Sequence, residues 1–528
     1  MVALMLACPS GPGMEETGAS DTDNASTTEA TGPGPATASE TSGPTTEPDP
    51  PTGTTTVDPV TSTTVDPVTS TTVDPSTTSN FDTSTSSTSD TSTSSDTSTS
   101  SDTSTSTTAD TSTSTTEGET TTGSTTSPID PPPGCDEAII HVGELFITDA
   151  TDLASLECIV EITENLIIQN TQSLVSFAEL ANLKRVGNNI EIEQNAALTD
   201  LSGLAGLESV EGKGFNARVY IIDNPALTDI SGLQALQHVD LVMIADCDAL
   251  TDLTGLTGIV EPSWSLEIFG NDNLTSLASL AGITDFAGRL YVQDNSKLTD
   301  LLPLADLVAP NMEALIIGGQ PLLTDLQGLE SVQTVGWLQI SDNPGLVDLS
   351  GLEGLTSVSE SLRVMSNPNL LNLEGLAALT QVETLEIDGN PQLVAFDGLE
   401  TLTQVNDLWF EDNPKLISLA ALANLTAITG TLEIGECGNQ GNDALIDLQG
   451  LENLTTLNAI NLYENDLLQT IAAIPQGIGL EYLSAIDNPM LPTTMLADYL
   501  AETTWDPEEV LCNNGGAPEA CECLVIPP

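Results

Sequence analysis

A short phrase recurs along most of this chain and constrains its fold more than any other feature. Residues 338–349 read LQISDNPGLVDL, and related phrases fill much of the sequence from about residue 160 to 490. The slot occupied by Asn343 recurs at intervals of 23 to 29 residues. A repeat in this range predicts a solenoid. We assign the slot to Thr171, Asn195, Asn224, Cys247, Asn271, Asn295, Gln320, Asn343, Asn367, Asn390, Asn413, Cys437, Asn465 and Asn488.

The pattern inside one repeat predicts a strand, a turn and an apolar tail. Leu338 and Ile340 alternate with polar residues, which is the period of a half-buried strand. The Asn343-Pro344 step ends that strand, because proline fixes φ and the asparagine amide bonds to nearby backbone groups. The leucines and Val358 that follow close the remaining sides of the coil. No coil buries these side chains alone, so neighbouring coils must stack.

These repeats resemble leucine-rich repeats, and more closely the receptor L-domain, the right-handed β-helical module of insulin- and EGF-receptor ectodomains. Residues 338–346 and 351–358 carry the resemblance, which covers residues 135–492. The interval of two residues between Asn343 and Leu346 favours the L-domain variety. The resemblance implies a repeat solenoid of right-handed β-helical, leucine-rich-repeat-like type. It does not imply one function, because such folds host many binding roles.

The N-terminus resembles the end of a lipoprotein signal peptide. Residues 1–8 form a short apolar run that ends at Cys8. The run has no positively charged start and is shorter than a normal apolar region, which a start site assigned too far downstream would explain. The alternative is a chance cysteine in a short apolar N-terminus. We favour Cys8 as the lipid-bearing residue because a polar segment follows it.

Residues 9–134 predict a disordered stalk between this anchor and a folded head. The segment consists mainly of Ser, Thr, Pro, Gly and Asp, with 19 acidic residues and no Lys or Arg. Such a composition has too little apolar surface to offset the entropy of ordering. A coil of this length spans about 60 Å. Ser and Thr with Pro also suit an extended, O-glycosylated stalk.

The cysteines of the head predict caps at both ends of the solenoid. A disulfide between Cys135 and Cys158 would close the first, irregular coil, although two unpaired buried thiols are the alternative. Residues 493–528 depart from the repeat and predict a C-terminal cap, with Cys512 bonded to Cys521 or Cys523. Cys247 and Cys437 lie in the repeat slot, where we interpret each as a small buried thiol.

Composition and motifs exclude several functions. The formal net charge is −70 with only 8 Lys and Arg, which argues against nucleic acid and against anionic lipid headgroups. The two histidines stand apart from each other, and no nucleotide-binding or hydrolase motif occurs. We therefore expect no enzyme, no cofactor and no resident metal.

A column of aspartates that includes Asp348 predicts a solvated acidic face, with weak calcium binding as the alternative. No transmembrane span is predicted, so any membrane attachment is through the lipid.

The outward face of the predicted strands carries the candidate ligand site. In a solvated sheet these positions should be polar, and an apolar run there indicates an interaction surface. The alternative is that the insertion around Phe215 covers it; a second insertion, residues 438–442, is another candidate loop. The predicted ligand-binding residues are Tyr220, Ile222, Met243, Phe269, Tyr291 and Ile316.

The sequence therefore predicts a non-enzymatic, lipid-anchored binding or adhesion protein of the cell envelope. A protein or glycan ligand is expected, and the oligomeric state is left open. The alternative is a structural envelope or matrix component without a specific ligand.

Overall fold

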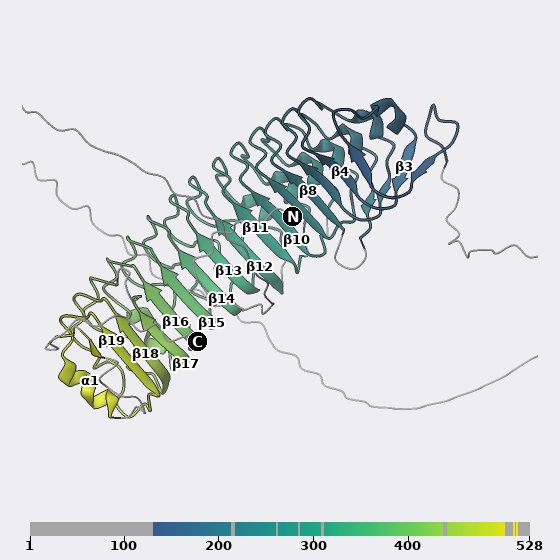
Figure 1. The fold of residues 1–528 in the computed structure, drawn as a ribbon. Coiled ribbons are helices and arrows are strands. Elements are labelled where there is room, and N and C mark those ends of the chain that lie inside the picture. The colour runs from purple at the N-terminus through teal and green to yellow at the C-terminus, as the bar shows by residue number, and fades with distance from the viewer. Residues whose placement is uncertain are drawn as a thin grey trace, which may run out of the picture. The chain divides into compact units, whose positions relative to one another are not determined.

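The computed structural model describes residues 130–212, 217–259, 262–283, 286–307, 311–436, 441–501, 511–512 and 514–515. These residues build a parallel β-solenoid of leucine-rich-repeat type, as the repeat predicts (Figure 1). The lipidation residue Cys8, the segment 9–129, the loop around Phe215, and Cys437, Cys521 and Cys523 lie outside the described residues.

A long parallel sheet runs through the solenoid, with one strand from each successive coil. Equivalent residues of successive coils lie side by side in it, as where Leu338 lies opposite Leu315 on one side and Leu362 on the other. Its strands are β2 (Leu145–Ile147), β4 (Leu166–Gln169), β6 (Ile190–Glu193), β8 (Arg218–Ile222), β9 (Leu241–Ala245), β10 (Ser265–Phe269), β11 (Arg289–Gln293), β12 (Met312–Gly318), β13 (Thr334–Ser341), β14 (Ser357–Met365), β15 (Gln381–Asp388), β16 (Gln404–Glu411), β17 (Ala427–Ile434), β18 (Thr456–Tyr463), β19 (Tyr482–Ile486) and β20 (Leu511–Cys512).

A second, shorter parallel sheet accompanies the first coils. It consists of β1 (Ile139–His141), β3 (Ile159–Ile162), β5 (Arg185–Val186) and β7 (Ser209–Val210). From β12 to β18 one longer strand takes both roles. Val358 of β14 pairs with Val382 of β15 and lies before a register shift, so the apolar row predicted to close the third side of the coil joins the long sheet.

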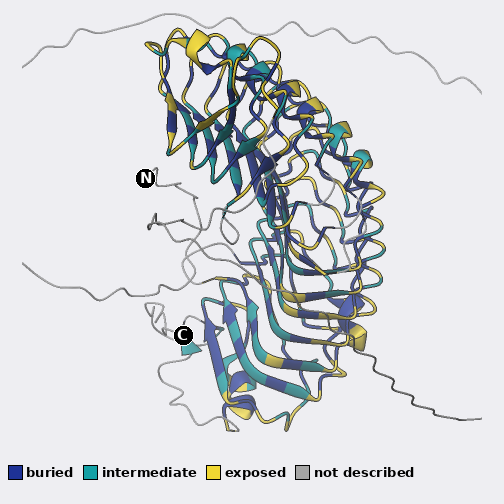
Figure 2. Ribbon diagram, turned by 90° about the vertical axis from the view of Figure 1, so that its right-hand side faces the viewer, coloured by how far each residue is buried: buried dark blue, intermediate teal, exposed yellow. Residues whose placement is uncertain are grey.

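Tight turns form the side of the solenoid opposite the long sheet. In Figure 2 the strands line the inner side of a curve and the turns line its outer side. One α-helix, α1 (Thr493–Leu500), follows β19 within the described residues. The 3₁₀ turns are η1 (Leu153–Leu156), η2 (Ala178–Leu180), η3 (Ser202–Leu204), η4 (Ser231–Leu233), η5 (Thr254–Leu256), η6 (Ala278–Leu280), η7 (Leu302–Leu304) and η8 (Ala420–Asn424).

The core is continuous along the whole solenoid because each coil adds the same apolar rows. Leu338, Ile340 and Leu346 have no exposed surface, and equivalent residues repeat in every coil. Larger side chains fill the core where the leucines leave space, as at Phe396 and Phe410, whose rings meet edge to face with centroids 5.2 Å apart.

A buried asparagine ladder runs parallel to the long sheet and explains the repeated slot. Asn367 Oδ1 accepts hydrogen bonds from the backbone N–H of Asn343 at 3.1 Å and from its Nδ2 at 3.2 Å. Asn343 Nδ2 also donates to the carbonyl of Ile317 in the preceding coil at 3.2 Å. Each amide therefore satisfies backbone groups that the turn removes from the sheet, which is why the slot is polar yet fully buried.

The ladder corrects one slot and adds another. Asn442, and not Cys437, occupies the slot between Asn413 and Asn465: its Oδ1 accepts from the backbone N–H of Asn413 at 3.3 Å. The insertion therefore precedes this slot. The slot accepts a cysteine at Cys247, but in this coil the amide oxygen of Asn442 bonds to Asn413. The ladder also continues past Asn488 to Asn514, whose Oδ1 accepts from the Asn488 N–H at 3.1 Å.

The predicted N-terminal disulfide is present. Cys135 and Cys158 are bonded, with their Cα atoms 5.7 Å apart, and close the first coil. Cys512 is also disulfide-bonded. Cys247 is a free, buried thiol in the repeat slot; burial raises its pKa to about 12, which makes it an inert structural residue.

Candidate binding surface

The outward residues of the long sheet form registered rows, which is where the candidate ligand residues lie. Tyr220, Met243, Glu267, Tyr291 and Ile316 are direct neighbours across β8 to β12. In a second row, Ile222 and Phe269 flank Ala245. The structure thus brings all six predicted residues onto one face. We call this face, from β8 to β12, the aromatic surface.

Burial differs among these six residues. Tyr220, Ile222, Phe269 and Tyr291 are half-buried, so each presents part of its side chain to solvent. Met243 and Ile316 are only 8% and 7% exposed. Each stands in the registered row between longer neighbours, which shield it. Met243 and Ile316 therefore pack beneath the aromatic surface and offer little area for contact with a ligand.

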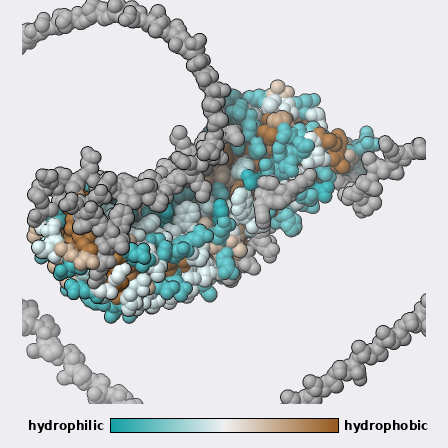
Figure 3. All heavy atoms as spheres, turned by 60° about the horizontal axis from the view of Figure 1, so that its bottom comes forward, coloured by the Kyte–Doolittle hydropathy of each residue, from teal (hydrophilic) through white to brown (hydrophobic). Residues whose placement is uncertain are grey.

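A small apolar cluster, separate from the main core, underlies this surface. It comprises buried Leu241, Met243 and Ala245, against which Tyr220, Ile222, Trp264 and Phe269 pack. Elsewhere, hydrophobic residues appear as separate patches among hydrophilic ones on the face drawn in Figure 3. A side-chain cluster on the outer face of a sheet needs a covering, and here the aromatic rings supply only part of it.

Trp264 and two arginines complete the aromatic surface and were not among the predicted residues. The guanidinium of Arg218 lies 4.9 Å from the centre of the Trp264 ring, and that of Arg289 lies 5.9 Å from it. The sequence did contain a signal for the two arginines. Arg218 and Arg289 are two of only 8 basic residues, and each begins a strand on this face.

The far end of the same sheet face is acidic. Asp388 of β15 lies opposite Glu411 of β16. Burial, reinforced by Asp388 and nearby glutamates, raises the pKa of Glu411 to about 8. Burial together with Asp412 and neighbouring glutamates raises the pKa of Asp388 to about 6. The described arginine on this part of the face, Arg363, pairs with Glu386 at 3.0 Å. Arg363 therefore does not pair with Asp388 or Glu411.

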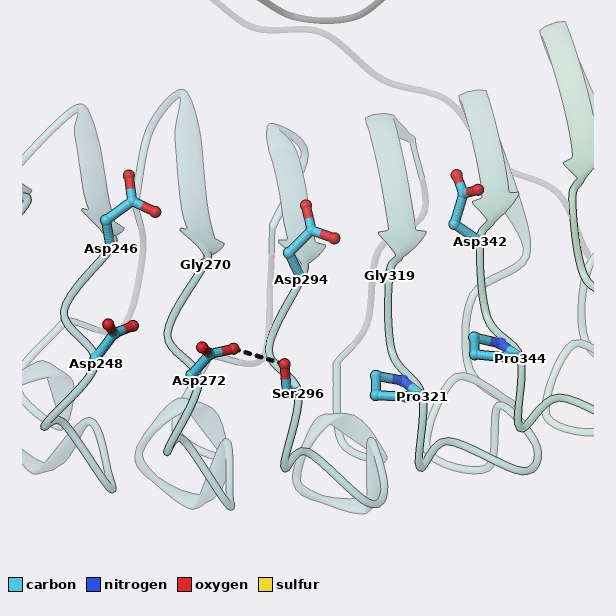
Figure 4. A pocket seen from close by; sticks show the side chains of 10 residues that line it. All are labelled: Asp246, Asp248, Gly270, Asp272, Asp294, Ser296, Gly319, Pro321, Asp342 and Pro344. Atoms are coloured by element: carbon cyan, nitrogen blue, oxygen red, sulfur yellow. Dashed lines mark hydrogen bonds between the residues drawn. The ribbon is translucent and has the colours of Figure 1, made fainter. Parts of the chain in front are cut away.

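A second acidic feature is a shallow groove along the turns that follow β9 to β13 (Figure 4). It encloses about 410 Å³. The Asp246 carboxylate fills the space where a Cβ on Gly270 would lie, and Asp272 accepts a hydrogen bond from Ser296 Oγ at 2.6 Å. Burial and neighbouring aspartates raise the pKa values of Asp246 and Asp294.

The predicted aspartate column has a local structural role. Asp348 Oδ1 accepts a hydrogen bond from the N–H of Ser350 at 3.0 Å, and Asp229 and Asp252 make the same contact two residues onward. These carboxylates therefore close turns on the outer side of the solenoid. Among the described residues, no group of three or more His, Cys, Asp or Glu side chains is placed to hold a metal ion.

The other candidates for chemistry stay apart. His141 lies in β1, and its ring contacts the carbonyl of Glu144, whereas His238 bridges to Ser209 in another coil. Within the part of the chain that the structure describes, no helix has the length and hydrophobicity to cross a bilayer.

Comparison with solved structures finds other solenoids. An internalin, InlF, from Listeria monocytogenes aligns with 68% of this chain and 90% of that chain, at 20% identity and a TM-score of 0.39. The functional domain of InlJ from the same organism aligns with 64% of this chain and 71% of that chain, at 19% identity and a TM-score of 0.32. No protein-family model matches, and the search of curated proteins found no match.

The class of protein follows from the register and the ladder themselves. A long parallel sheet with an asparagine ladder and a continuous leucine core is a leucine-rich-repeat-like solenoid. Its outward sheet face carries one partly exposed aromatic region and one acidic region.

Proposed function

We propose that this chain is a non-enzymatic binding or adhesion protein whose solenoid contacts a protein or glycan through the aromatic surface. The observation that carries the proposal is the second apolar cluster, where Tyr220, Ile222, Trp264 and Phe269 stay half-buried. Aromatic and arginine side chains dominate the energy of many interfaces. We also propose that the repeat is of the receptor L-domain variety.

The setting of the solenoid is also part of the proposal. Residues 1–8 anchor the chain through a lipid on Cys8, residues 9–134 act as a spacer, residues 135–492 form the repeat head, and residues 493–528 form its cap. A long polar spacer suits a binding head that must reach a partner away from the membrane. The protein would then lie on the cell envelope with the head outward.

A pull-down from envelope extract, followed by affinity measurement with the purified partner, tests the binding role. Phe269→Ala and Tyr291→Ala should each weaken binding at least about tenfold, since truncated interface anchors cost about 2 kcal/mol. Ile417→Ala is the matched control, because this apolar residue is 56% exposed and lies outside the long sheet. Equal affinities for all three variants would remove the aromatic surface from the binding site.

The second candidate function is a structural envelope or matrix component without a specific ligand. The low number of basic residues and the strong negative charge favour a self-repelling, well-solvated layer. Failure of the wild-type head to retain any partner at physiological salt would favour this role.

A further inference from the structure

Arg218 is the one described arginine that forms no ion pair. The chain has 78 acidic residues against 8 Lys and Arg, and the described arginines other than Arg218 each pair with a glutamate, although Lys297 and Lys415 bond to amides. On the described outward face, Arg289 pairs with Glu313, and Arg363 pairs with Glu386 at 3.0 Å. No described carboxylate lies within 4.0 Å of Arg218. Glu267, on the same face, accepts a hydrogen bond from Ser265 Oγ at 2.8 Å and acts on Arg218 and Arg289 only through a longer-range attraction of opposite charges.

Among the described residues, the guanidinium of Arg218 is held in place by contacts other than an ion pair. It stacks on Trp264 at 4.9 Å, and Nη1 donates to Tyr220 Oη at 3.2 Å. Its Nε is buried and has no hydrogen-bond partner within the described ranges. Stacking on an indole and one hydroxyl contact orient the planar donor group, but they do not neutralise its charge.

Arg218 lies at the start of β8, at one edge of an apolar part of the sheet face. Further along the same face, Ile222 and Phe269 lie half-buried against the buried cluster of Leu241, Met243 and Ala245. A carboxylate that reaches Arg218 in this setting is partly desolvated, so its charge-assisted hydrogen bonds are stronger than in water. Aliphatic and aromatic groups around one cation match a peptide in which an acidic residue stands among apolar residues.

We propose that Arg218 receives an aspartate or glutamate side chain of a polypeptide partner, whose neighbouring apolar residues cover Trp264, Phe269 and Ile222. This inference rests on the proposed function, since it names the partner chemistry of the aromatic surface. A polyanion such as nucleic acid does not fit, because the chain carries a net charge of −70 and offers only one unpaired guanidinium on this face of the described residues. A single carboxylate on an otherwise apolar segment avoids that repulsion.

Selection from a phage-displayed library of random linear peptides tests the inference with the full-length chain. The wild type should enrich peptides with an Asp or Glu flanked by apolar residues. Replacing that acid by Asn or Gln in a selected peptide should weaken binding at least about tenfold in fluorescence anisotropy. This change leaves the protein untouched, so it does not depend on how a variant folds.

Charge reversal supplies the protein-side test. R218E should lose the wild-type peptides and enrich peptides with Lys or Arg instead. K415E makes the same change in charge at an exposed side chain that contacts Gln392 outside the sheet, and should leave the selected sequences unchanged. Arg218→Gln should also lose the acid preference while its circular dichroism and melting temperature stay near those of the wild type.

The outcomes separate the two proposals. Enriched peptides without an acid, or equal affinity of Arg218→Gln for acid-containing peptides, overturn the role of Arg218 and leave binding at the aromatic surface standing. Enrichment of acidic peptides that K415E abolishes equally would show a general charge effect and overturn it too. If the wild type enriches no peptide, polypeptide binding by this surface fails, and with it the role of Arg218.

Discussion

Asp388 and Glu411 lie directly opposite each other on neighbouring strands of the long sheet, and no described cation separates them. Burial and the surrounding carboxylates raise the pKa of Glu411 to about 8 and that of Asp388 to about 6. Glu386, Glu433 and Glu436 add to the negative potential at Glu411, so the acidic end of the sheet binds protons more tightly when it is folded.

This pair predicts that the head is more stable in mild acid than at neutral or basic pH. Between about pH 4 and pH 8 the folded state binds more protons than the unfolded state, so the free energy of unfolding falls as pH rises. The stabilisation that comes from protonating this pair is complete below the ordinary carboxyl pKa and is lost by about pH 8. Urea unfolding at several pH values measures it. Glu411→Gln should flatten the dependence, whereas Glu360→Gln, at an exposed position of β14, should not.

Asn343→Ala should destabilise the solenoid by about 3 kcal/mol. The substitution leaves the N–H of Gln320 and the carbonyl of Ile317 without their amide partner, and each buried unsatisfied group costs about 1–3 kcal/mol. Thermal and urea unfolding measure the loss. The control is Asn369→Ala, which removes an exposed amide bonded to the carbonyl of Pro344. Similar melting temperatures for the two variants would contradict a structural role for the ladder.

Gly351→Ala should be among the most disruptive small substitutions. Gly351 has φ +112°, and a Cβ there would lie 2.0 Å from the Leu326 carbonyl oxygen of the preceding coil. Backbone strain alone costs about 1–3 kcal/mol, and the overlap forces adjacent coils apart. We expect a lower urea midpoint by circular dichroism. Gly282→Ala should leave the midpoint unchanged, since no heavy atom lies within 4 Å of its added Cβ.

Reduction of the Cys135–Cys158 disulfide should loosen only the N-terminal end. The bond closes a loop with a sequence separation of 23, which corresponds to about 3 kcal/mol of loop entropy. In a solenoid each coil contacts mainly its neighbours, so the effect decays along the stack. Hydrogen exchange should accelerate in β1 and β2 and stay unchanged in β13 to β16. Uniform acceleration would show instead that the solenoid unfolds as one cooperative unit.

Cys8→Ser should move the protein from the membrane to the soluble fraction. Cys8 ends the apolar run that precedes the polar segment, and we assign it as the lipid-bearing residue. The variant is expressed with its full upstream signal, and membrane and soluble fractions are compared by immunoblot. Cys247→Ser, at a buried thiol, is the control for loss of a cysteine. Retention of the Cys8 variant at the membrane would exclude this anchor.

The repeat alone determined the coil and its inward and outward rows, because every coil meets nearly the same environment. The two cysteines that flank the irregular first coil predicted the first disulfide. The alternation of Leu338 and Ile340 with polar residues predicts which side of the strand is buried, and it does so for each coil because similar coils stack on one another. The same regularity placed Tyr220 and Tyr291 on one face.

Only the tertiary structure decided the features that depend on contacts between unlike coils. Spacing allowed Cys437 in the slot, but the structure places Asn442 there, where its Oδ1 accepts a hydrogen bond from the Asn413 N–H. Met243 is buried although it points outward, because neighbouring coils supply larger side chains. The stacking of Arg218 on Trp264, and the pKa of about 8 at Glu411, arise from distance and burial across coils, which the pattern of a single repeat does not encode.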